Sequence, residues 1–256
     1  MQDGGTEITM RDYSEETKKR VEFIKYQLKI SGAKGVVYGN SGGKDSALVG
    51  ILCKKATDNV LGVIMPCQSK RNYEEDTKDG LEVAQKFDIK TVTVDLSDVK
   101  KTLTDEISKV CEISSLAGAN IAPRLRMTTV YTIGQSLGYL VAGTGNASEA
   151  KMGYYTKWGD GAHDFNPISD LTVTEIYEFL RYLEAPECII KKAPSAGLFD
   201  GQTDENEMGI TYKAIDDYIL YGKGDEKTIE KIEAAYKRNE HKRKMPATYL
   251  QYINEK

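Results

Sequence analysis

The stretch Gly35-Val-Val-Tyr-Gly-Asn-Ser-Gly-Gly-Lys-Asp-Ser46 decides the fold, because an apolar strand runs into a glycine-rich turn and then into the helical pattern of residues 47–53. Ser41, Gly42 and Gly43 let the backbone approach an anion closely. The unpaired N–H groups of the following helix supply donors and the positive end of a dipole. The stretch therefore predicts a site for a phosphate or a pyrophosphate.

Two positions separate this loop from the Walker A pattern. Tyr38 stands where that pattern has its leading glycine, and Asp45 replaces the hydroxyl that binds magnesium. A carboxylate beside a phosphate repels it unless a cation lies between them, so Asp45 is predicted to bind Mg²⁺. Ser-Gly-Gly-Lys-Asp-Ser46 therefore resembles the pyrophosphate loop of ATP pyrophosphatases, which cleave ATP between the α and β phosphates. The alternative, a tight turn that only needs a positive φ, is less favoured because strand, glycines, Asp and serines occur together.

Length and charge narrow the class of protein. The 256 residues suffice for one large α/β domain with an appended helical segment. A formal charge of −4 and a pI near 5.5 argue against a general nucleic-acid or membrane-surface binder and favour a small-molecule partner. The four cysteines are far apart, and no basic and apolar leader or membrane-spanning run is recognisable, so we expect a cytoplasmic protein without a zinc cluster.

Apolar strand patterns alternate with helical ones. We expect further strands at residues 60–65, 90–95 and 139–144, and helices at residues 14–31, 72–87, 96–114, 121–137, 212–220 and 225–238. This alternation predicts a doubly wound, mainly parallel sheet flanked by helices, whose ligands bind beyond the carboxyl ends of the strands. Residues 153–164 and 193–207 are polar and lack a clear period, which is typical of binding loops or lids.

A second strand and glycine turn ends in Gly143-Thr-Gly-Asn-Ala-Ser-Glu149. Thr144 and Glu149 can reach the same pocket as Asp45, and Glu149 is then a candidate second magnesium ligand. The alternative is an ordinary helix start, with Asn146 or Ser148 as cap and Glu149 in the first turn.

The segment Lys151-Met-Gly-Tyr-Tyr-Thr-Lys-Trp-Gly-Asp-Gly-Ala-His-Asp164, together with the pyrophosphate loop, resembles the ammonia-dependent NAD synthetase family. The resemblance runs from about residue 36 to 246, in family order, and includes Asn120-Ile-Ala-Pro-Arg-Leu-Arg-Met127, Lys192-Ala-Pro-Ser195, Asp204-Glu-Asn-Glu-Met-Gly-Ile-Thr-Tyr212 and Glu240-His-Lys-Arg243. It implies an adenine nucleotide alpha hydrolase-like fold in a single domain of residues 1–256. The ATP pyrophosphatase core would cover about residues 33–190, and a lid loop and C-terminal helices about residues 191–256.

The resemblance also implies a ligase that joins deamido-NAD (nicotinic acid adenine dinucleotide) to ammonia with ATP and Mg²⁺, through an adenylated intermediate, in the last step of NAD biosynthesis. A homodimer is implied as well. Family positions assign ATP to Gly39, Asn40, Ser41, Gly42, Gly43, Lys44, Asp45, Ser46, Thr144 and Ser195, and Mg²⁺ to Asp45 and Glu149. They assign deamido-NAD to Arg124, Lys157, Asp164, His241 and Lys242.

Ammonia is mostly ammonium at neutral pH, so a carboxylate that captures and deprotonates it is useful. Asp160 and Glu207 fit proposals made for the family, although both lie in expected polar loops, where a solvated acid is the commoner case.

Two residues depart from the family pattern. Val173 stands where a lysine that contacts ATP is usual, and Ser195 replaces a threonine but keeps the hydroxyl. Either Lys151, Lys191 or Lys192 replaces the missing charge, or ATP is held more weakly.

Two other functions remain open. Another pyrophosphate-loop ligase would need a glutamine-hydrolysing domain, a basic face or catalytic cysteines, none of which is evident. A non-catalytic nucleotide-binding regulator would have no need of the second-substrate residues. The lack of a glutaminase domain favours free ammonia, unless a separate subunit supplies it.

Overall fold

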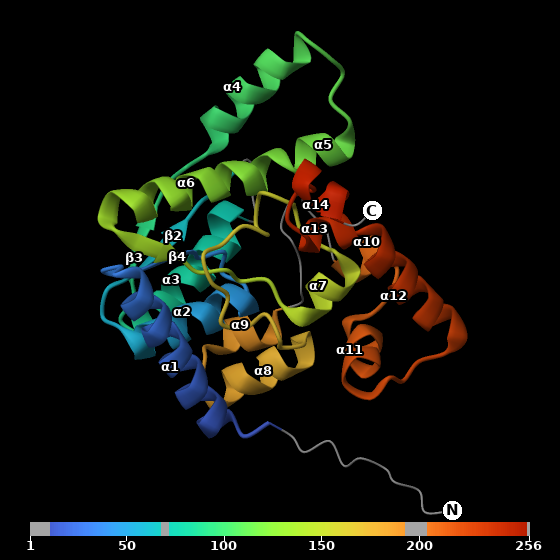
Figure 1. The fold of residues 1–256 in the computed structure, drawn as a ribbon. Coiled ribbons are helices and arrows are strands. Elements are labelled where there is room, and N and C mark those ends of the chain that lie inside the picture. The colour runs from blue at the N-terminus through green and yellow to red at the C-terminus, as the bar shows by residue number, and fades with distance from the viewer. Residues whose placement is uncertain (1–10, 68–71, 193–203, 255–256) are drawn as a thin grey trace, which may run out of the picture.

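A four-stranded parallel sheet forms the centre of the computed structural model, which describes residues 11–67, 72–192 and 204–254 (Figure 1). The strands are β1 (Gly35–Gly39), β2 (Val60–Ile64), β3 (Lys90–Thr93) and β4 (Tyr139–Val141), in the order β3-β2-β1-β4. Every neighbouring pair is parallel, which confirms the predicted α/β sheet. The three later strands end one to three residues before their predicted ends.

Helical crossovers connect the parallel strands. Helix α2 (Lys44–Ala56) joins β1 to β2, and the π-turn η1 (Asn72–Asp76) with α3 (Thr77–Lys86) precedes β3. Helices α4 (Ser97–Ser108), α5 (Ser115–Ala119) and α6 (Ile121–Leu137) lead to β4. Because the chain returns to pair β4 with β1, the strand order reverses between these two strands, and a crevice is expected at their carboxyl ends.

Side chains of β1 alternate between two apolar cores. Val36 and Tyr38 belong to one core with residues of α2, α1 (Tyr13–Ser31) and α8 (Val173–Tyr182), whereas Val37 packs in the other with residues of α6. Figure 1 shows α6 on one side of the sheet and α1, α2 and α8 on the other. Because both faces of β1 are buried, the loop that follows β1 starts from a well-packed strand.

Residues 96–114 do not form the one helix predicted from the sequence. Helix α4 ends at Ser108, and α5 begins after Ser114, whose Oγ accepts a hydrogen bond from Ala117 N at 3.4 Å. This side-chain cap favours a new helix start over continuation. The predicted helix at 72–87 is also modified, because its first turn is the π-turn η1.

The remaining helices lie in the second half of the chain. They are α7 (Ala147–Met152), α9 (Glu187–Lys191), α10 (Asp204–Met208), α11 (Tyr212–Tyr221), α12 (Glu226–Arg238), α13 (Glu240–Arg243) and α14 (Tyr249–Asn254). Met152 of α7, Val173 of α8, Ile215 of α11 and Ile232 of α12 form a third apolar core. Within the described ranges, no helix is long and apolar enough to cross a membrane.

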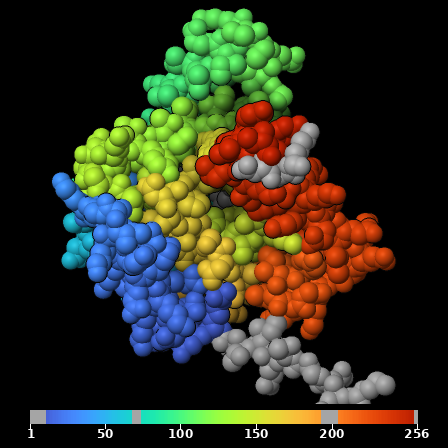
Figure 2. All heavy atoms as spheres, in the orientation of Figure 1, coloured from blue at the N-terminus to red at the C-terminus, as the bar shows by residue number. Residues whose placement is uncertain are grey.

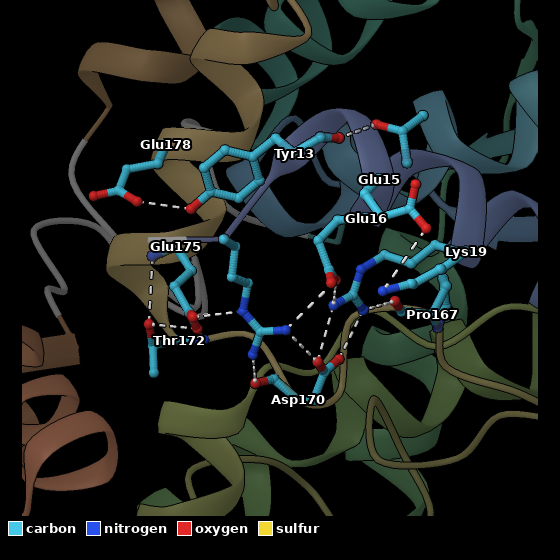
Figure 3. A network of polar contacts seen from close by, with 12 residues as sticks. Tyr13, Glu15, Glu16, Lys19, Pro167, Asp170, Thr172, Glu175 and Glu178 are labelled. Atoms are coloured by element: carbon cyan, nitrogen blue, oxygen red, sulfur yellow. Dashed lines mark hydrogen bonds and ion pairs between the residues drawn. The ribbon is translucent and has the colours of Figure 1, made fainter. Parts of the chain in front are cut away.

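An ionic network fastens Arg11 and α1 to the segment before α8 and to the first turn of α8 (Figure 3). Arg20 donates to Pro167 O at 2.6 Å and to Asp170 Oδ1 at 2.7 Å. Arg11 Nε donates to Glu175 Oε1 at 2.6 Å, and Glu175 in turn completes the capping box of α8. These bonds hold Pro167 and Asp170, which do not line the cavity described next, against α1.

Candidate active site

A cavity of about 690 Å³ opens at the carboxyl ends of β1 and β4, where the strand order reverses. Its wall combines the loop after β1, the turn after β4, residues 153–162 and the C-terminal helix α13. In Figure 2 the surface is hollowed between the yellow atoms of the middle segment and the red C-terminal helices. The size suits a small-molecule ligand.

The loop at residues 39–46, here called the glycine loop, has the geometry of an anion site. Gly42 has a φ of +67°, and a Cβ there would lie 2.0 Å from Asp76 O, so only glycine fits. Gly43 is the N-cap of α2 and provides no side-chain cap. Ser46 Oγ lies 3.0 Å from Ser41 Oγ and donates to Gly43 O at 3.0 Å. The amides at the start of α2 therefore face the cavity without a capping side chain.

Asp45 and Glu149 meet through Asn146. Asn146 Nδ2 donates to Asp45 Oδ1 at 3.1 Å, and Asn146 Oδ1 accepts from Glu149 N at 2.9 Å. Glu149 Oε2 accepts from Asn146 N at 3.1 Å, which completes a capping box at the start of α7. Glu149 therefore takes part in a helix cap and also lies near Asp45. The role as a helix cap and the role as a magnesium ligand do not exclude each other.

Burial and the negative charge of Asp45 raise the pKa of Glu149 to about 8. Lys44 Nζ lies 2.8 Å from Asp45 Oδ2. Burial lowers the pKa of Lys44, but the charges of Asp45 and Glu149 outweigh burial, so the net direction is upward. One buried cation therefore faces two carboxylates. Among the described residues, no three His, Cys, Asp or Glu side chains gather as a metal-binding set.

Basic side chains gather at the other end of the cavity. Lys157 Nζ donates to His241 O at 2.6 Å, and Arg124 donates to Lys157 O at 3.5 Å. Lys242 Nζ donates to Gly153 O at 2.6 Å and to Tyr155 O. Desolvation lowers the pKa of Lys242. Arg124, Lys157, His241 and Lys242 all line the cavity.

The two carboxylates predicted to act on ammonia line the same cavity. Asp160 Oδ1 accepts from Thr156 N at 2.9 Å, and desolvation raises the pKa of its carboxyl. Glu207 Oε2 accepts from Tyr154 OH at 2.6 Å. The placement of Glu207 in a loop was wrong, because it lies on the short helix α10, which is too brief for a helical period to be recognised.

Most of the predicted ATP residues line the cavity: Gly39, Asn40, Ser41, Gly43, Lys44, Asp45, Ser46 and Thr144. Gly42 is not among the lining residues, and its Cα packs closely against the backbone of Asp76. Asp164 does not line the cavity, and its Oδ2 accepts from Val141 N at 2.7 Å. Ser195 and most of the predicted lid, residues 193–203, lie outside the described residues.

Two further cavity residues, Asp204 and Tyr177, received no role from the sequence. Asp204 is 3 % exposed and accepts from Tyr212 OH at 2.9 Å, and Tyr177 OH donates to Lys192 O at 2.6 Å. Asp204 begins one of the motifs that carry the family resemblance, and this motif could have indicated a place in the site. Tyr177 lines the cavity because of how α8 packs, and no local sequence pattern predicts this position.

Val173 packs in the apolar core beside Ile215 and does not line the cavity. The three lysines considered as replacements differ in position. Lys151 pairs with Glu233 at 2.8 Å, and the exposed Lys191 pairs with Glu187 at 3.1 Å. Lys192 Nζ instead reaches the glycine loop, 3.1 Å from Gly42 O.

Comparisons with known proteins agree on the family. The NAD synthase family model matches residues 16–246. The chain is 45 % identical, over 92 % of its length and 97 % of the relative's, to the NH(3)-dependent NAD(+) synthetase of Carboxydothermus hydrogenoformans. Two solved structures are similar across 93 % of the chain. NMN synthetase from Francisella tularensis has a TM-score of 0.87 at 34 % identity over 98 % of that chain. NH3-dependent NAD synthetase from Campylobacter jejuni has a TM-score of 0.74 at 33 % identity over 99 % of that chain. With the family model spanning most of the chain and a cavity that joins its matching motifs, the chain belongs to the NAD synthase family.

Proposed function

We propose that this protein makes NAD from deamido-NAD, ammonia and ATP, and releases AMP and pyrophosphate. The observation that carries the proposal is the hydrogen bond between Asn146 and Asp45, because it joins the glycine loop to the turn that bears Glu149. One cavity thereby contains an anion loop, two carboxylates and a basic end. The names of the relatives, which are NH(3)-dependent NAD(+) synthetases, support the same activity.

In the first step, a carboxylate oxygen of deamido-NAD attacks the α-phosphorus of ATP, and pyrophosphate leaves. This step needs alignment and neutralisation of phosphate charge, and no protein nucleophile. The amides at the start of α2 and the ammonium of Lys44 lie where they would hold the phosphates. Arg124, Lys157 and Lys242 would hold the dinucleotide at the basic end.

Asp45 and Glu149 would bind Mg²⁺ together with phosphate oxygens. Mg²⁺ is usually bound by one or two carboxylates plus substrate phosphates, so a pair of protein ligands is sufficient. The raised pKa of Glu149 fits this assignment, because the two carboxylates repel each other until a divalent cation offsets their charge. The ion would neutralise the charge that develops on the phosphates.

In the second step, the nitrogen of ammonia attacks the acyl carbon of the adenylated intermediate, and AMP leaves. The attacking nitrogen loses a proton, which a nearby carboxylate can accept. Asp160 suits this role because its raised pKa makes it a better proton acceptor than an ordinary aspartate. Glu207 lines the same cavity and is the second candidate.

A second candidate function is the same amidation of a smaller substrate. The similarity to NMN synthetase from Francisella tularensis has the higher TM-score of the two structural comparisons, 0.87 against 0.74. The substrate would then be nicotinic acid mononucleotide, and the product nicotinamide mononucleotide. The chemistry at the carboxyl group and the glycine loop would be unchanged.

One assay separates the two candidates. The purified protein is incubated with ATP, Mg²⁺, ammonium and either deamido-NAD or nicotinic acid mononucleotide, and the amide products and AMP are quantified. We expect NAD and AMP in equal amounts, with a higher kcat/KM for deamido-NAD. A higher kcat/KM for the mononucleotide would establish the second candidate. Formation of ADP, or of neither amide, would refute both.

The homodimer and the division into a core at about residues 33–190 and a C-terminal lid remain part of the proposal. Sedimentation at several protein concentrations tests the dimer. The two alternative classes have less support: the match to the NAD synthase model disfavours another pyrophosphate-loop ligase. A regulator without turnover would not require Asp160 and the basic end to share the cavity of the glycine loop.

A further inference from the structure

Lys192 lies where three parts of the chain meet at the cavity wall. It follows α9, and its Nζ donates to Gly42 O in the glycine loop at 3.1 Å. The same Nζ donates to Asp76 Oδ1 at 2.7 Å and to Asp79 Oδ2 at 2.6 Å, at the π-turn η1 and the start of α3. The lysine therefore connects the anion loop to the helix packed behind it.

The position of this ammonium is fixed before any ligand arrives. Its side chain is 15 % exposed, and those of Asp76 and Asp79 are 13 % and 14 % exposed. Tyr177 OH donates to the backbone carbonyl of Lys192, which holds the base of the side chain. A flexible lysine that is already ordered loses little further entropy when it binds.

The three acceptors are unequal. Two are carboxylates at short distances, and the third is the neutral carbonyl of Gly42 at 3.1 Å. An ammonium has three donors, and it binds a charged oxygen more strongly than a neutral one. A phosphate on the glycine loop can thus replace the Gly42 carbonyl while both aspartates keep Nζ in place.

We propose that Lys192 binds the β- and γ-phosphates of ATP, and the pyrophosphate product, on the side of the glycine loop opposite the Asp45–Glu149 pair. This inference rests on the proposed function for the identity of the nucleotide. It assigns to Lys192 the ionic contact that Val173, buried in the apolar core, cannot make. Lys44 is engaged by Asp45, so Lys192 supplies a second cation to the leaving pyrophosphate.

The test compares binding of three probes, Mg²⁺-pyrophosphate, Mg²⁺-ATP and AMP, by calorimetry without deamido-NAD. Lys192→Met should weaken pyrophosphate and ATP by at least about tenfold, about 1.4 kcal/mol, because one charge-assisted bond is lost. AMP has no β- or γ-phosphate, so its affinity should change by less than about twofold, within the error of a surface change. Lys192→Arg should keep most of the pyrophosphate affinity. The matched control is Lys191→Met, because Lys191 is 78 % exposed and pairs only with Glu187 in the described part of the chain.

Equal weakening of all three probes in a folded Lys192→Met protein would mean that the lysine only supports the loop, and an unchanged pyrophosphate affinity would also overturn the proposal. Asp79→Asn provides a second test if Lys192→Met fails to fold. A contact to phosphate predicts equal or tighter pyrophosphate binding, since one competing carboxylate is removed, whereas a supporting role predicts weaker binding. These measurements need no turnover, so the inference and the proposed function can fail separately.

Discussion

Asn146 and Asp45 are 101 positions apart in sequence, yet the amide of Asn146 donates directly to the Asp45 carboxylate at 3.1 Å. The same side chain caps α7 through Glu149 N at 2.9 Å. One buried amide therefore fixes the direction of one carboxylate and the helix that presents the other. This double role ties the stability of α7 to the geometry of the proposed magnesium site.

Asn146→Ala should lower both stability and turnover. Loss of an N-cap costs about 1 kcal/mol, and loss of a hydrogen bond to a charged group about 1.5–3 kcal/mol. We expect kcat/KM for ATP to fall at least about tenfold, because Asp45 loses its fixed direction. Asp12→Ala is the matched control, since Asp12 caps α1 away from the cavity, and it should lower stability without changing kcat/KM. Equal loss of activity in both variants would contradict this prediction.

Glu149 should make the metal-free protein less stable as the pH rises. Its pKa is about 8 in the folded protein, against an ordinary value of 4.5. Below pH 4.5 the carboxyl is protonated in both states. Between pH 4.5 and about 8 only the unfolded chain releases the proton, so the free energy of unfolding falls across this window. Denaturant unfolding in EDTA measures the fall, and Glu149→Gln should flatten it. If the free energy of unfolding of Glu149→Gln falls with pH as steeply as that of the unchanged protein, Glu149 is not the group responsible.

Asp216→Asn should destabilise the packing of α7 against α8. Asp216 accepts from Ser148 Oγ at 2.5 Å and from Thr174 N at 2.8 Å, so it joins α7 to the start of α8. Asparagine keeps one acceptor oxygen and replaces the other by an NH2 donor, which then faces a donor; this loss should cost about 1–3 kcal/mol and lower Tm by several degrees. The Mg²⁺ concentration for half-maximal rate should rise, because α7 carries Glu149. Asp217→Asn is the control, because Asp217 pairs with Lys213 on the surface. Equal Tm and equal Mg²⁺ dependence in the two variants would count against a positioning role.

Lys242→Met should weaken the binding of deamido-NAD. Lys242 belongs to the basic end of the cavity and donates to two carbonyls of the loop at residues 153–162. We expect KM for deamido-NAD to rise by about tenfold or more, as loss of a charge-assisted contact does, while ATP binding stays within about twofold. Lys244→Met is the matched control, because Lys244 is 69 % exposed and pairs with Glu240. A rise in KM for ATP of the same size would mean that the cavity as a whole is deformed.

The glycine loop could be predicted from sequence because its requirements are local. A positive φ at Gly42, an uncapped helix start at Gly43 and a preceding buried strand are all set by neighbouring residues. The parallel sheet followed for a similar reason, since alternating strand and helix patterns permit few connections. Glu149 was predicted with two competing roles, and the capping box beside Asp45 accommodates both.

Other parts of the site depend on packing between distant segments. The contact of Lys192 with Asp76 and Asp79 joins residues more than 110 positions apart, and no periodicity encodes it. Glu207 was assigned to a loop because a five-residue helix is too short to display an apolar stripe. Asp164 followed the family pattern, but in the structure its carboxylate is bonded to the backbone of Val141.

The contacts of Arg11 and Arg20 determine where the protein can be truncated or tagged. Arg11 and Arg20 both bind Asp170, and Asn166 and Leu171, within the same held segment, bond to Gly145 O at 2.8 Å and Ala147 N at 2.8 Å. A chain that begins after Arg20 would lose both guanidinium contacts and free the back of the turn that carries Thr144 and Glu149. Affinity tags therefore belong ahead of Arg11, and truncation libraries should retain residues 11–20.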